Sequence, residues 1–394
     1  MSVWPTIALR DAGKWLSGGT PKRDEPSFWG GTVPWIGTKD LKSFELDGSS
    51  EFVTEEGADT GSRVVDAGTV LFATRGMSLA KEFRVGIATR RVAFNQDVKA
   101  IVPRRDVEGR FLAWFLRSQG QYVLDQCDTA THGTKRLPLE RIDGMPVPVP
   151  PLPEQRRIAA ILDEADALRR KRREALALLD DLLRATFLDM FGDVWDGRFP
   201  LAPIGTLGHI QMGRQRAPKY QTGESTRRYL RVANVRMDEL RLDDVLEMDF
   251  GIADRETYRL VHGDILLNEG QSTELVGRPA LWRDELPECY FQNPLLRFRC
   301  APRVTTPEYM VDIFLKLLRS GIFAAQSAKT SNMAHLGASR FARIAVPVPP
   351  LADQIAWSTL REAIRTERLR VAPSLGAADS LFSSLLHRAF TGDL

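Results

Sequence analysis

Reactive side chains are sparse in this sequence, and none are spaced like a catalytic or metal site. Cys127, Cys289 and Cys300 show no Cys-x-x-Cys spacing, and the 5 histidines add no zinc pattern. No GxxxxGK[ST] phosphate loop is present, which argues against an ATPase of that type. The string Asn293-Pro-Leu-Leu296 lacks the second proline and the aromatic residue of an amino-methyltransferase motif. We therefore expect no catalytic residues, no bound metal and no cofactor.

One short string could belong to a nuclease. Asp97-Val-Lys99 fits the acid-x-Lys half of a common nuclease metal site, but no upstream acidic half is evident. Its counterpart later in the chain, Asn293-Pro-Leu295, keeps neither the acid nor the lysine. The alternative interpretation is a strand whose side chains alternate between two faces.

The basic residues favour arginine strongly. Arginine supplies 43 of the 54 basic residues, although the net charge is only +3. Its planar fork suits phosphate groups and guanine edges, so nucleic acid is one interpretation. A genome rich in G and C, which encodes arginine in preference to lysine, is the other.

A proline-rich decapeptide occurs twice. Pro146-Val-Pro-Val-Pro-Pro-Leu-Pro-Glu-Gln155 returns as Ala345-Val-Pro-Val-Pro-Pro-Leu-Ala-Asp-Gln354, with seven of ten residues identical. Each copy, which we call a collar, follows a region of roughly 145 residues and precedes a helical pattern. Because consecutive prolines favour an extended chain, and Pro153 suits the first turn of a helix, each collar should connect a globular region to a helix.

The two globular regions share short strand patterns and glycine turns. Asp66-Ala-Gly-Thr-Val-Leu-Phe72 matches His262-Gly-Asp-Ile-Leu-Leu267, which aligns Gly68 with Gly263 before a buried strand. The short strands and few helices predict an α+β fold, with a curved sheet in each repeated domain. The expected boundaries are 1–145 and 196–344 for the domains, and 146–195 and 345–394 for the collars with their helices.

The helical patterns after the collars predict two long rods. In the first, apolar residues follow alternating spacings of three and four from Glu154 to Met190. In the second, Pro373 and Gly376 interrupt the pattern, so we expect a bend or break there and a shorter or kinked helix. We expect the rods to pack as an antiparallel coiled coil rather than lie as unrelated surface helices. The positions expected to pack are Ile158, Ile161, Ala165, Leu168, Leu179, Leu182, Ile364, Leu381 and Leu385.

The arrangement resembles the DNA-specificity subunit of type I restriction–modification systems. The resemblance rests on the collars, on Thr186-Phe-Leu-Asp-Met-Phe-Gly-Asp193 and on the C-terminal Leu386-His-Arg-Ala-Phe-Thr-Gly-Asp-Leu394. Pro34-Trp-Ile-Gly-Thr-Lys-Asp-Leu41 and Asn95-Gln-Asp-Val-Lys99 also look like parts of that family's target-recognition domains. The resemblance implies two such domains, each reading one half of a bipartite site in double-stranded DNA. It also implies spacer helices that dock two methyltransferase subunits, and a motor–nuclease subunit that joins the larger complex.

Loops rich in arginine, lysine, amide and hydroxyl side chains lie at corresponding places in the two domains. These side chains can neutralise phosphates or read base edges, although any one of them could simply be a solvated surface residue. The candidates in the first domain are Thr20, Lys22, Arg23, Thr38, Lys39, Arg75, Ser78, Lys81, Lys135 and Arg136. Those in the second are Arg214, Gln215, Arg216, Lys219, Arg231, Asn234, Gln271, Ser272, Thr273, Lys329, Ser331 and Asn332. The two sets differ in type, which fits two different half-sites.

The run Arg169-Arg-Lys-Arg-Arg173 lies on the first rod. It could face spacer phosphates or a partner, or be a solvated helix face.

The bulk composition fits a cytosolic protein without a membrane segment. Hydrophobic residues make up 43% of the chain, no apolar stretch approaches a membrane span, and the N-terminus lacks a signal-peptide pattern. Two alternatives to a non-catalytic specificity subunit stay open. One is a single-chain nuclease or methyltransferase that binds DNA, and the other is a coiled-coil scaffold that binds proteins.

Overall fold

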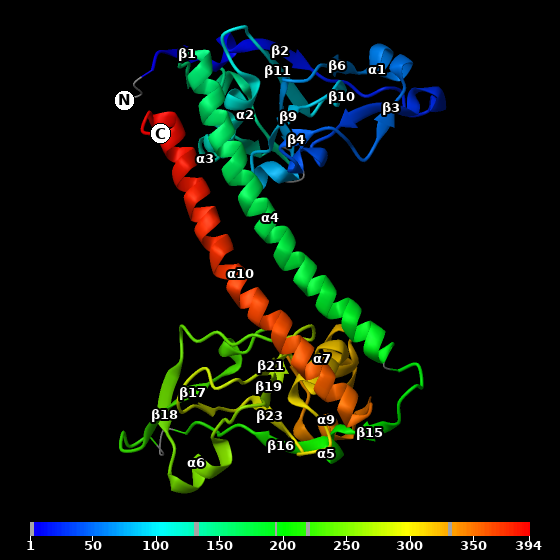
Figure 1. Ribbon diagram of the computed structural model, residues 1–394, viewed down its shortest axis with the longest axis vertical. Helices are drawn as coiled ribbons and strands as arrows, with labels where there is room; N and C mark the ends of the chain where they lie inside the picture. Colours follow the sequence, from blue (N-terminus) through cyan, green and yellow to red (C-terminus); the bar gives the residue numbers. More distant parts are fainter. Residues whose placement is uncertain (1–3, 130–133, 194, 218–220, 330–332) are drawn as a thin grey trace. The chain divides into compact units, whose positions relative to one another are not determined.

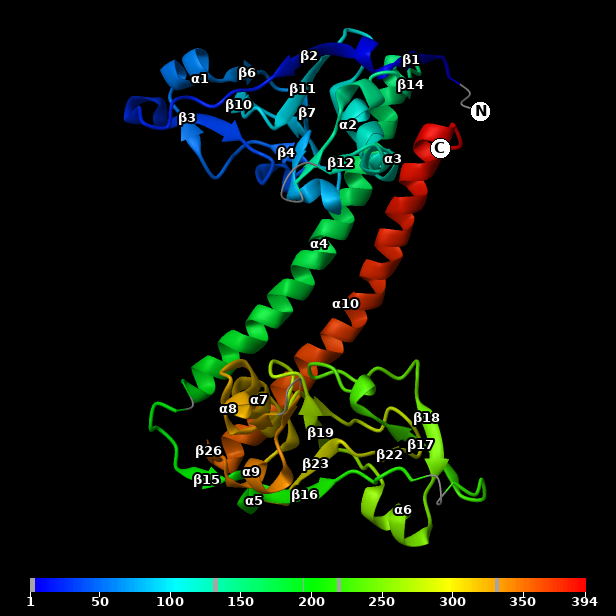
Figure 2. The same ribbon diagram turned by 180° about the vertical axis from the view of Figure 1, so that it is seen from behind.

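Each proline collar forms a short strand followed by a long helix in the computed structural model, which describes residues 4–129, 134–193, 195–217, 221–329 and 333–394. Strand β14 (Pro146–Pro148) precedes α4 (Leu152–Phe191), and β26 (Ala345–Pro347) precedes α10 (Leu351–Thr391). The chain divides into two compact units: unit 1 contains Met1–Glu174 and Ala372–Leu394, and unit 2 contains Ala175–Val371. Each unit therefore combines one globular region with parts of both long helices (Figures 1 and 2).

Unit 1 contains a five-stranded sheet with the order β2-β11-β7-β9-β4 and a four-stranded sheet with the order β5-β3-β10-β6. The strands of the first are β2 (Gly13–Ser17), β11 (Val98–Pro103), β7 (Val70–Ala73), β9 (Val85–Ala88) and β4 (Glu45–Leu46). Those of the second are β5 (Phe52–Val53), β3 (Trp29–Ile36), β10 (Val92–Phe94) and β6 (Arg63–Val65). The helices are α1 (Glu55–Gly61), α2 (Gly109–Ser118) and α3 (Gly120–Asp125). Helix α2 packs on β7 and β9 because its apolar residues are buried almost throughout.

Unit 2 repeats this plan with a four-stranded sheet in the order β16-β23-β19-β21 and a three-stranded sheet in the order β18-β17-β22. The strands are β16 (Gly208–Met212), β23 (Leu295–Cys300), β19 (Asp264–Asn268), β21 (Pro279–Leu281), β18 (Leu246–Asp249), β17 (Thr226–Leu230) and β22 (Tyr290–Phe291). The helices are α5 (Ile204–Leu207), α6 (Ile252–Tyr258), α7 (Pro307–Arg319), α8 (Ile322–Gln326) and α9 (Ala338–Arg343). The predicted α+β class with a repeated domain is confirmed.

Matching backbone details support the repeat. Gly68 and Gly263 both have a φ of 87°, a left-handed conformation that glycine adopts without steric cost. Each sits in the turn before a buried strand, as the sequence alignment predicted. The collar strands also pair alike: β14 with β1 (Thr6–Ala8), and β26 with β15 (Leu201–Pro203).

The glutamine that ends each collar ties the long helix to the globular region of its unit. Gln155 is fully buried, and its Oε1 accepts the backbone N–H of Glu108 at 2.8 Å. Its Nε2 donates to the carbonyls of Asp106 and Pro150, each at 2.8 Å. Gln354 likewise accepts the backbone N–H of Thr306 at 3.0 Å and donates to the Pro349 carbonyl at 2.9 Å. Glu108 and Thr306 are the N-caps of α2 and α7, so each glutamine binds the start of a helix.

The two long helices run antiparallel within each unit. In unit 1, Arg157 Nη2 donates to the Leu394 carbonyl at 2.8 Å, and Arg173 pairs with Asp379 at 2.5 Å. In unit 2, Asp180 pairs with Arg368 at 3.2 Å, and the Phe187 and Trp357 ring centroids are 5.2 Å apart. The predicted antiparallel pairing is therefore confirmed in each unit by itself.

The break expected at Pro373 is not present. Helix α10 is continuous over 41 residues, against 40 in α4, so the second rod is neither interrupted nor shorter. Pro373 removes the N–H that would bond the carbonyl of Leu369. Leu369 itself is 56% exposed.

The residues predicted to pack along the helices have mixed surroundings. Ile158 and Ile364 are buried, and Ile161, Ala165, Leu179 and Leu385 are half-buried. Leu168, Leu182 and Leu381 stay 40%, 50% and 50% exposed. The coiled-coil spacing missed Leu162, which is fully buried because α4 packs on the core of the globular region as well as on α10.

An aspartate–tryptophan contact fastens each long helix, with the partners exchanged between units. In unit 1, Trp114 on α2 donates from Nε1 to Asp163 on α4 at 2.9 Å. In unit 2, Trp357 on α10 donates to Asp312 on α7, also at 2.9 Å. The repeat thus conserves the type of contact while swapping which helix carries the carboxylate.

Candidate nucleic-acid interface

A small three-stranded sheet gathers several predicted DNA-contact residues in unit 1. It consists of β12 (Asp128–Thr129), β13 (Lys135–Arg136) and β8 (Arg75–Gly76). Arg136 lies directly opposite Arg75, and Lys135 lies opposite Gly76, although about 60 residues separate them in sequence. Arg75 and Arg136 are exposed, while Lys135 Nζ donates to Thr129 Oγ1 at 2.8 Å. The sheet therefore concentrates positive charge at one place.

Unit 2 has the same small sheet with different side chains. It consists of β20 (Gly270–Gln271), β25 (Ala334–His335) and β24 (Ala328–Lys329). Gln271 and Lys329 both lie opposite Ala334, and Lys329 is exposed. The sheets correspond because Leu137 donates to the Thr74 carbonyl just as Leu336 donates to the Glu269 carbonyl, each at 2.9 Å. Two arginines and a lysine in unit 1 thus correspond to a mainly neutral, amide-bearing surface in unit 2.

A second group of predicted residues in unit 1 converges on one carboxylate. Arg23 pairs with Glu51 at 2.5 Å and Lys39 pairs with the same residue at 3.7 Å. The hydrogen bond from Arg23 holds the pKa of Glu51 below its ordinary value. The Arg23 guanidinium also lies 4.0 Å from the Trp29 ring centroid and 4.9 Å from that of Trp35. Arg23 is therefore held in place, with one excess positive charge in this group.

The remaining predicted DNA-contact residues of unit 1 lie in turns close to these groups. Thr20 contacts Gln96 at 2.5 Å, which brings in a polar residue that the sequence did not single out. Lys22 and Lys81 are exposed and Thr38 is half-buried. Ser78 belongs to the 3₁₀ turn η4 (Met77–Ala80), and its buried Oγ makes no hydrogen bond within the described chain.

Three predicted residues of unit 2 serve the fold. Asn234 is 1% exposed, accepts the Arg231 backbone N–H at 2.9 Å, and donates to the carbonyls of Arg241 and Asp244. It occupies the same turn position as Asp40 of unit 1, which accepts the Gly37 N–H at 2.8 Å. Because both N–H groups of its amide are engaged inside the turn and the residue is buried, the structure does not present Asn234 to a base.

Arg231 and Arg214 are also engaged. Arg231 is paired with Asp244. The Arg214 side chain is 12% exposed, lies 2.8 Å from Asp254, and sits above the Phe250 ring. These contacts reduce their availability to DNA. A loop with arginine or asparagine can need those residues for its own hydrogen bonds, and sequence pattern does not distinguish the two uses.

Other candidates in unit 2 are accessible. Gln215, Arg216 and Thr273 are exposed, while Gln271 and Ser272 are half-buried, with Gln271 Oε1 accepting the Ser272 N–H at 3.1 Å. Lys219, Ser331 and Asn332 lie outside the described residues. Sequence reasoning also missed Arg278, a buried arginine at the edge of the main sheet, because it lies in a strand-like apolar stretch rather than a polar loop.

The arginine run on α4 packs partly within unit 1. The guanidinium of Arg169 lies 3.7 Å from the Phe382 ring centroid on α10 and pairs with the buried Asp166 at 2.6 Å. Arg170 pairs with the same aspartate at 2.9 Å. These residues therefore help to hold the helix pair together, and the run is not a uniformly solvated face.

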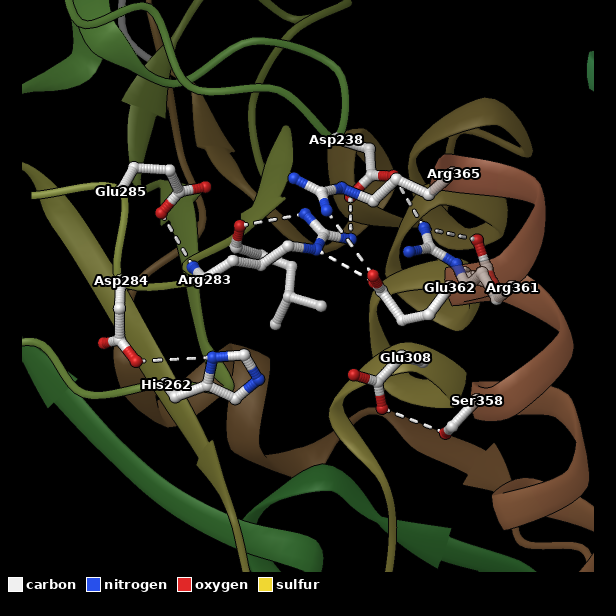
Figure 3. Close-up of polar contacts among 12 residues, drawn as sticks. Asp238, His262, Arg283, Asp284, Glu285, Glu308, Ser358, Arg361, Glu362 and Arg365 are labelled. Atoms are coloured by element: carbon white, nitrogen blue, oxygen red, sulfur yellow. Dashed lines mark hydrogen bonds and ion pairs between the residues drawn. The ribbon is translucent and has the colours of Figure 1, made fainter. Parts of the chain in front are cut away.

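A buried ion network joins the globular region of unit 2 to α10, and Figure 3 shows its charged side chains converging. Arg361 on α10 is 2% exposed and contacts Asp238 at 2.6 Å and Asp312 at 2.8 Å. Arg283 at the end of β21 reaches Glu362 at 3.1 Å. Burial raises the pKa of Asp312. Burial alone would lower the pKa of Arg361, but the negative charges of Asp312 and Asp238 outweigh it and raise that pKa. The turn that contains Asp238 is therefore fixed to the helix.

The nuclease-like string forms ordinary strand contacts. Asp97 donates its backbone N–H to Asn95 Oδ1 and accepts the Thr74 N–H at its carbonyl, while Lys99 Nζ contacts Ser17 Oγ across β11 and β2. Among the described residues, no group of three or more His, Cys, Asp and Glu side chains is arranged to hold a metal ion. None of the helices in the described ranges is both long and apolar enough to cross a membrane.

The comparisons with known proteins relate part of this chain to one group of proteins. Residues 1–178 match the family model described as the type I restriction modification DNA specificity domain. The chain is 28% identical over 167 residues to the type I restriction enzyme EcoR124I/EcoR124II specificity subunit of Escherichia coli. It is 26% identical over 196 residues to the MjaIX specificity subunit of Methanocaldococcus jannaschii. These matches span 42% and 48% of this chain but only 41% and 44% of those relatives.

A solved structure extends the likeness in fold to nearly the whole chain. The S subunit of a type I restriction–modification system from M. genitalium matches with a TM-score of 0.62 at 11% identity. The match covers 98% of this chain and 96% of that one. Residues 1–178 are therefore similar to the DNA specificity domain of type I restriction–modification systems, and nearly the whole chain shares the fold of a solved S subunit.

Proposed function

We propose that this chain is a non-catalytic specificity subunit that reads a bipartite target in double-stranded DNA. Residues 1–145 form one target-recognition domain and residues 196–344 form the other, each reading one half-site. The observation that carries the proposal is the repeated small sheet, which presents Arg75, Lys135 and Arg136 in unit 1 but Gln271 and Lys329 in unit 2. The same scaffold with different side chains is what two different half-sites would require.

The long helices act as the spacer between the half-sites and as the docking region for partners. Gln155 and Gln354 join each helix to its domain through buried hydrogen bonds, which favours a rigid connection. We propose that two methyltransferase subunits dock through these helical regions, and that a motor–nuclease subunit joins through the assembled complex. Catalysis then belongs to those subunits.

The test is a genome-wide map of methylated bases in cells with and without this chain. Loss of methylation should fall on one motif made of two specific parts separated by a fixed, unspecified gap. No change, or loss of a short continuous motif, would contradict the proposal. Purified chain supplied with DNA and either Mg²⁺ or a methyl donor serves as the control. Cleavage or methylation by the chain alone would favour an enzyme instead.

A further inference from the structure

Arg278 is a buried arginine for which the described part of the chain provides no partner. It is 7% exposed, and its Nε is shielded from water without a hydrogen bond. No ion pair or side-chain hydrogen bond involves its guanidinium within the described ranges. A buried charge without a counterion is costly, so arginine at such a position calls for an explanation.

The repeat supplies a direct comparison, because Arg84 occupies the same place in unit 1. The Ala73 N–H donates to the Arg84 carbonyl at 3.1 Å, just as the Asn268 N–H donates to the Arg278 carbonyl at 3.2 Å. Arg84 has two partners: its Nε contacts Glu82 at 3.1 Å, and its Nη1 donates to the Thr38 carbonyl at 3.2 Å. Unit 2 keeps the arginine at this position and lacks both contacts.

Two neighbours make the surroundings of Arg278 suited to an anion. Asn268 lies directly across the β19–β21 pair, is fully buried, and uses neither its Oδ1 nor its Nδ2 in any hydrogen bond among the described residues. The Arg236 turn is tied to the same strand, because the Asp238 N–H donates to the Pro279 carbonyl at 2.9 Å. Burial and the nearby charge of Arg236 both lower the pKa of Arg278. A bound anion would favour the charged form of Arg278 and so offset both effects on its pKa.

The loop predicted to contact DNA, residues 271–273, lies next to Arg278 in the structure. The turn that begins at Ser272 closes through hydrogen bonds from Leu275 and Val276 to the Ser272 carbonyl, at 3.0 and 2.9 Å. It ends where Arg278 donates its backbone N–H to the Leu275 carbonyl at 3.1 Å. Arg278 therefore lies at the base of the loop that carries Gln271, Ser272 and Thr273.

We propose that Arg278 binds a backbone phosphate of DNA in the half-site read by unit 2, with Arg236 adding positive charge. This inference rests on the proposed function. A phosphate is favoured over a base edge because a residue that is 7% exposed cannot extend into the major groove. Phosphates protrude from the duplex and can approach a recessed guanidinium. The contact positions the domain on DNA without selecting a sequence.

The experiment compares Arg278→Met with Arg84→Met in the full chain. Arg278→Met should keep or raise the melting temperature, because it removes an unpaired buried charge. Arg84→Met should lower the melting temperature by about 3 °C or more, because it breaks contacts to Glu82 and Thr38. Stability therefore separates a partnered structural arginine from one kept for binding.

Binding to a mixed-sequence DNA duplex over a range of salt concentrations supplies the second measurement. Arg278→Met should weaken affinity about ten-fold and reduce the slope of log affinity against log salt by about one. Arg278→Lys should keep the wild-type slope, because the charge remains, while binding less tightly than arginine. Arg84→Met should leave the slope unchanged.

The outcomes separate this inference from the proposed function. If the wild-type chain binds the duplex with a steep salt dependence and Arg278→Met binds equally well, the phosphate site is wrong and the function stands. If Arg278 instead binds an acidic partner protein, Arg278→Met would also leave duplex binding unchanged, and the phosphate site would be wrong. A large fall in melting temperature for Arg278→Met would show a structural arginine and also overturn the inference. If the wild-type chain binds no duplex, both proposals fail.

Discussion

Gln155 makes three hydrogen bonds with backbone groups in a site closed to water, and Gln354 repeats two of them in unit 2. The collar sequence predicted a connection between domain and helix, but it could not reveal that its last residue binds the start of a separate helix. Such contacts join residues about 47 positions apart, and local sequence patterns carry no information about them. Asn234, a predicted DNA-contact residue, shows a related limit, because its side chain forms hydrogen bonds within its own turn and the sequence pattern does not reveal this use.

Replacing Gln155 by leucine should destabilise unit 1 by about 3 kcal/mol, because the Glu108 N–H and the Asp106 and Pro150 carbonyls lose a buried partner. Urea denaturation of the full chain measures the change. Gln121→Leu, at an exposed position on α3, is the control and should change the free energy of unfolding by less than about 0.5 kcal/mol. Equal effects from both substitutions would refute the role assigned to Gln155.

Glu51 gives a prediction that depends on pH. Its pKa is lowered from the ordinary 4.5, chiefly by the hydrogen bond from Arg23. A carboxyl whose folded-state pKa is lowered contributes stability above its unfolded pKa, and that contribution is lost as pH falls through the folded value. Arg23→Met should therefore be less stable than wild type at pH 7, with the gap closing in acid below about 4.5. Unfolding measured across this range would contradict the assignment if the gap stayed constant.

At the scale of elements, the continuous helix α10 shows what local propensity can and cannot predict. Pro373 correctly marked a missing hydrogen bond, but the helix passes through it, because packing of Ile364 and Phe382 on either side holds the chain helical. The buried strands after Gly68 and Gly263 were predictable, since an apolar run after a left-handed glycine has few alternatives. The small sheets were not predictable, because each pairs strands of only two residues from distant parts of the sequence.

Pro373→Ala should stabilise α10 by roughly 1–3 kcal/mol, because it restores the bond to the Leu369 carbonyl and removes an unfavourable residue from the helix interior. Thermal unfolding of the full chain measures the gain. Gly376→Ala, one turn further on, tests helix propensity alone and should contribute about 1 kcal/mol. A lower melting temperature for Pro373→Ala would mean that the helix depends on the proline.

At the scale of the whole molecule, the duplication was visible in the sequence because the collars kept seven of ten residues. The structure adds that the repeat runs through the contacts themselves, from the collar glutamines to the aspartate–tryptophan pairs. The compact units include parts of both helices, which sequence boundaries drawn at the collars could not anticipate, because the last part of α10 packs on the first domain, which is distant along the chain. The buried Arg278 was not singled out for a different reason, since it lies in an apolar, strand-like stretch rather than in a polar loop.

The central claim is that each domain reads its own half of one DNA target. The most direct test replaces residues 1–145 with the corresponding domain of a related specificity subunit, in cells that carry the partner subunits, and maps methylated bases across the genome. The account predicts that one half of the recognised motif changes while the other half and the gap between them stay the same. A change in both halves, or no change in either, would contradict it.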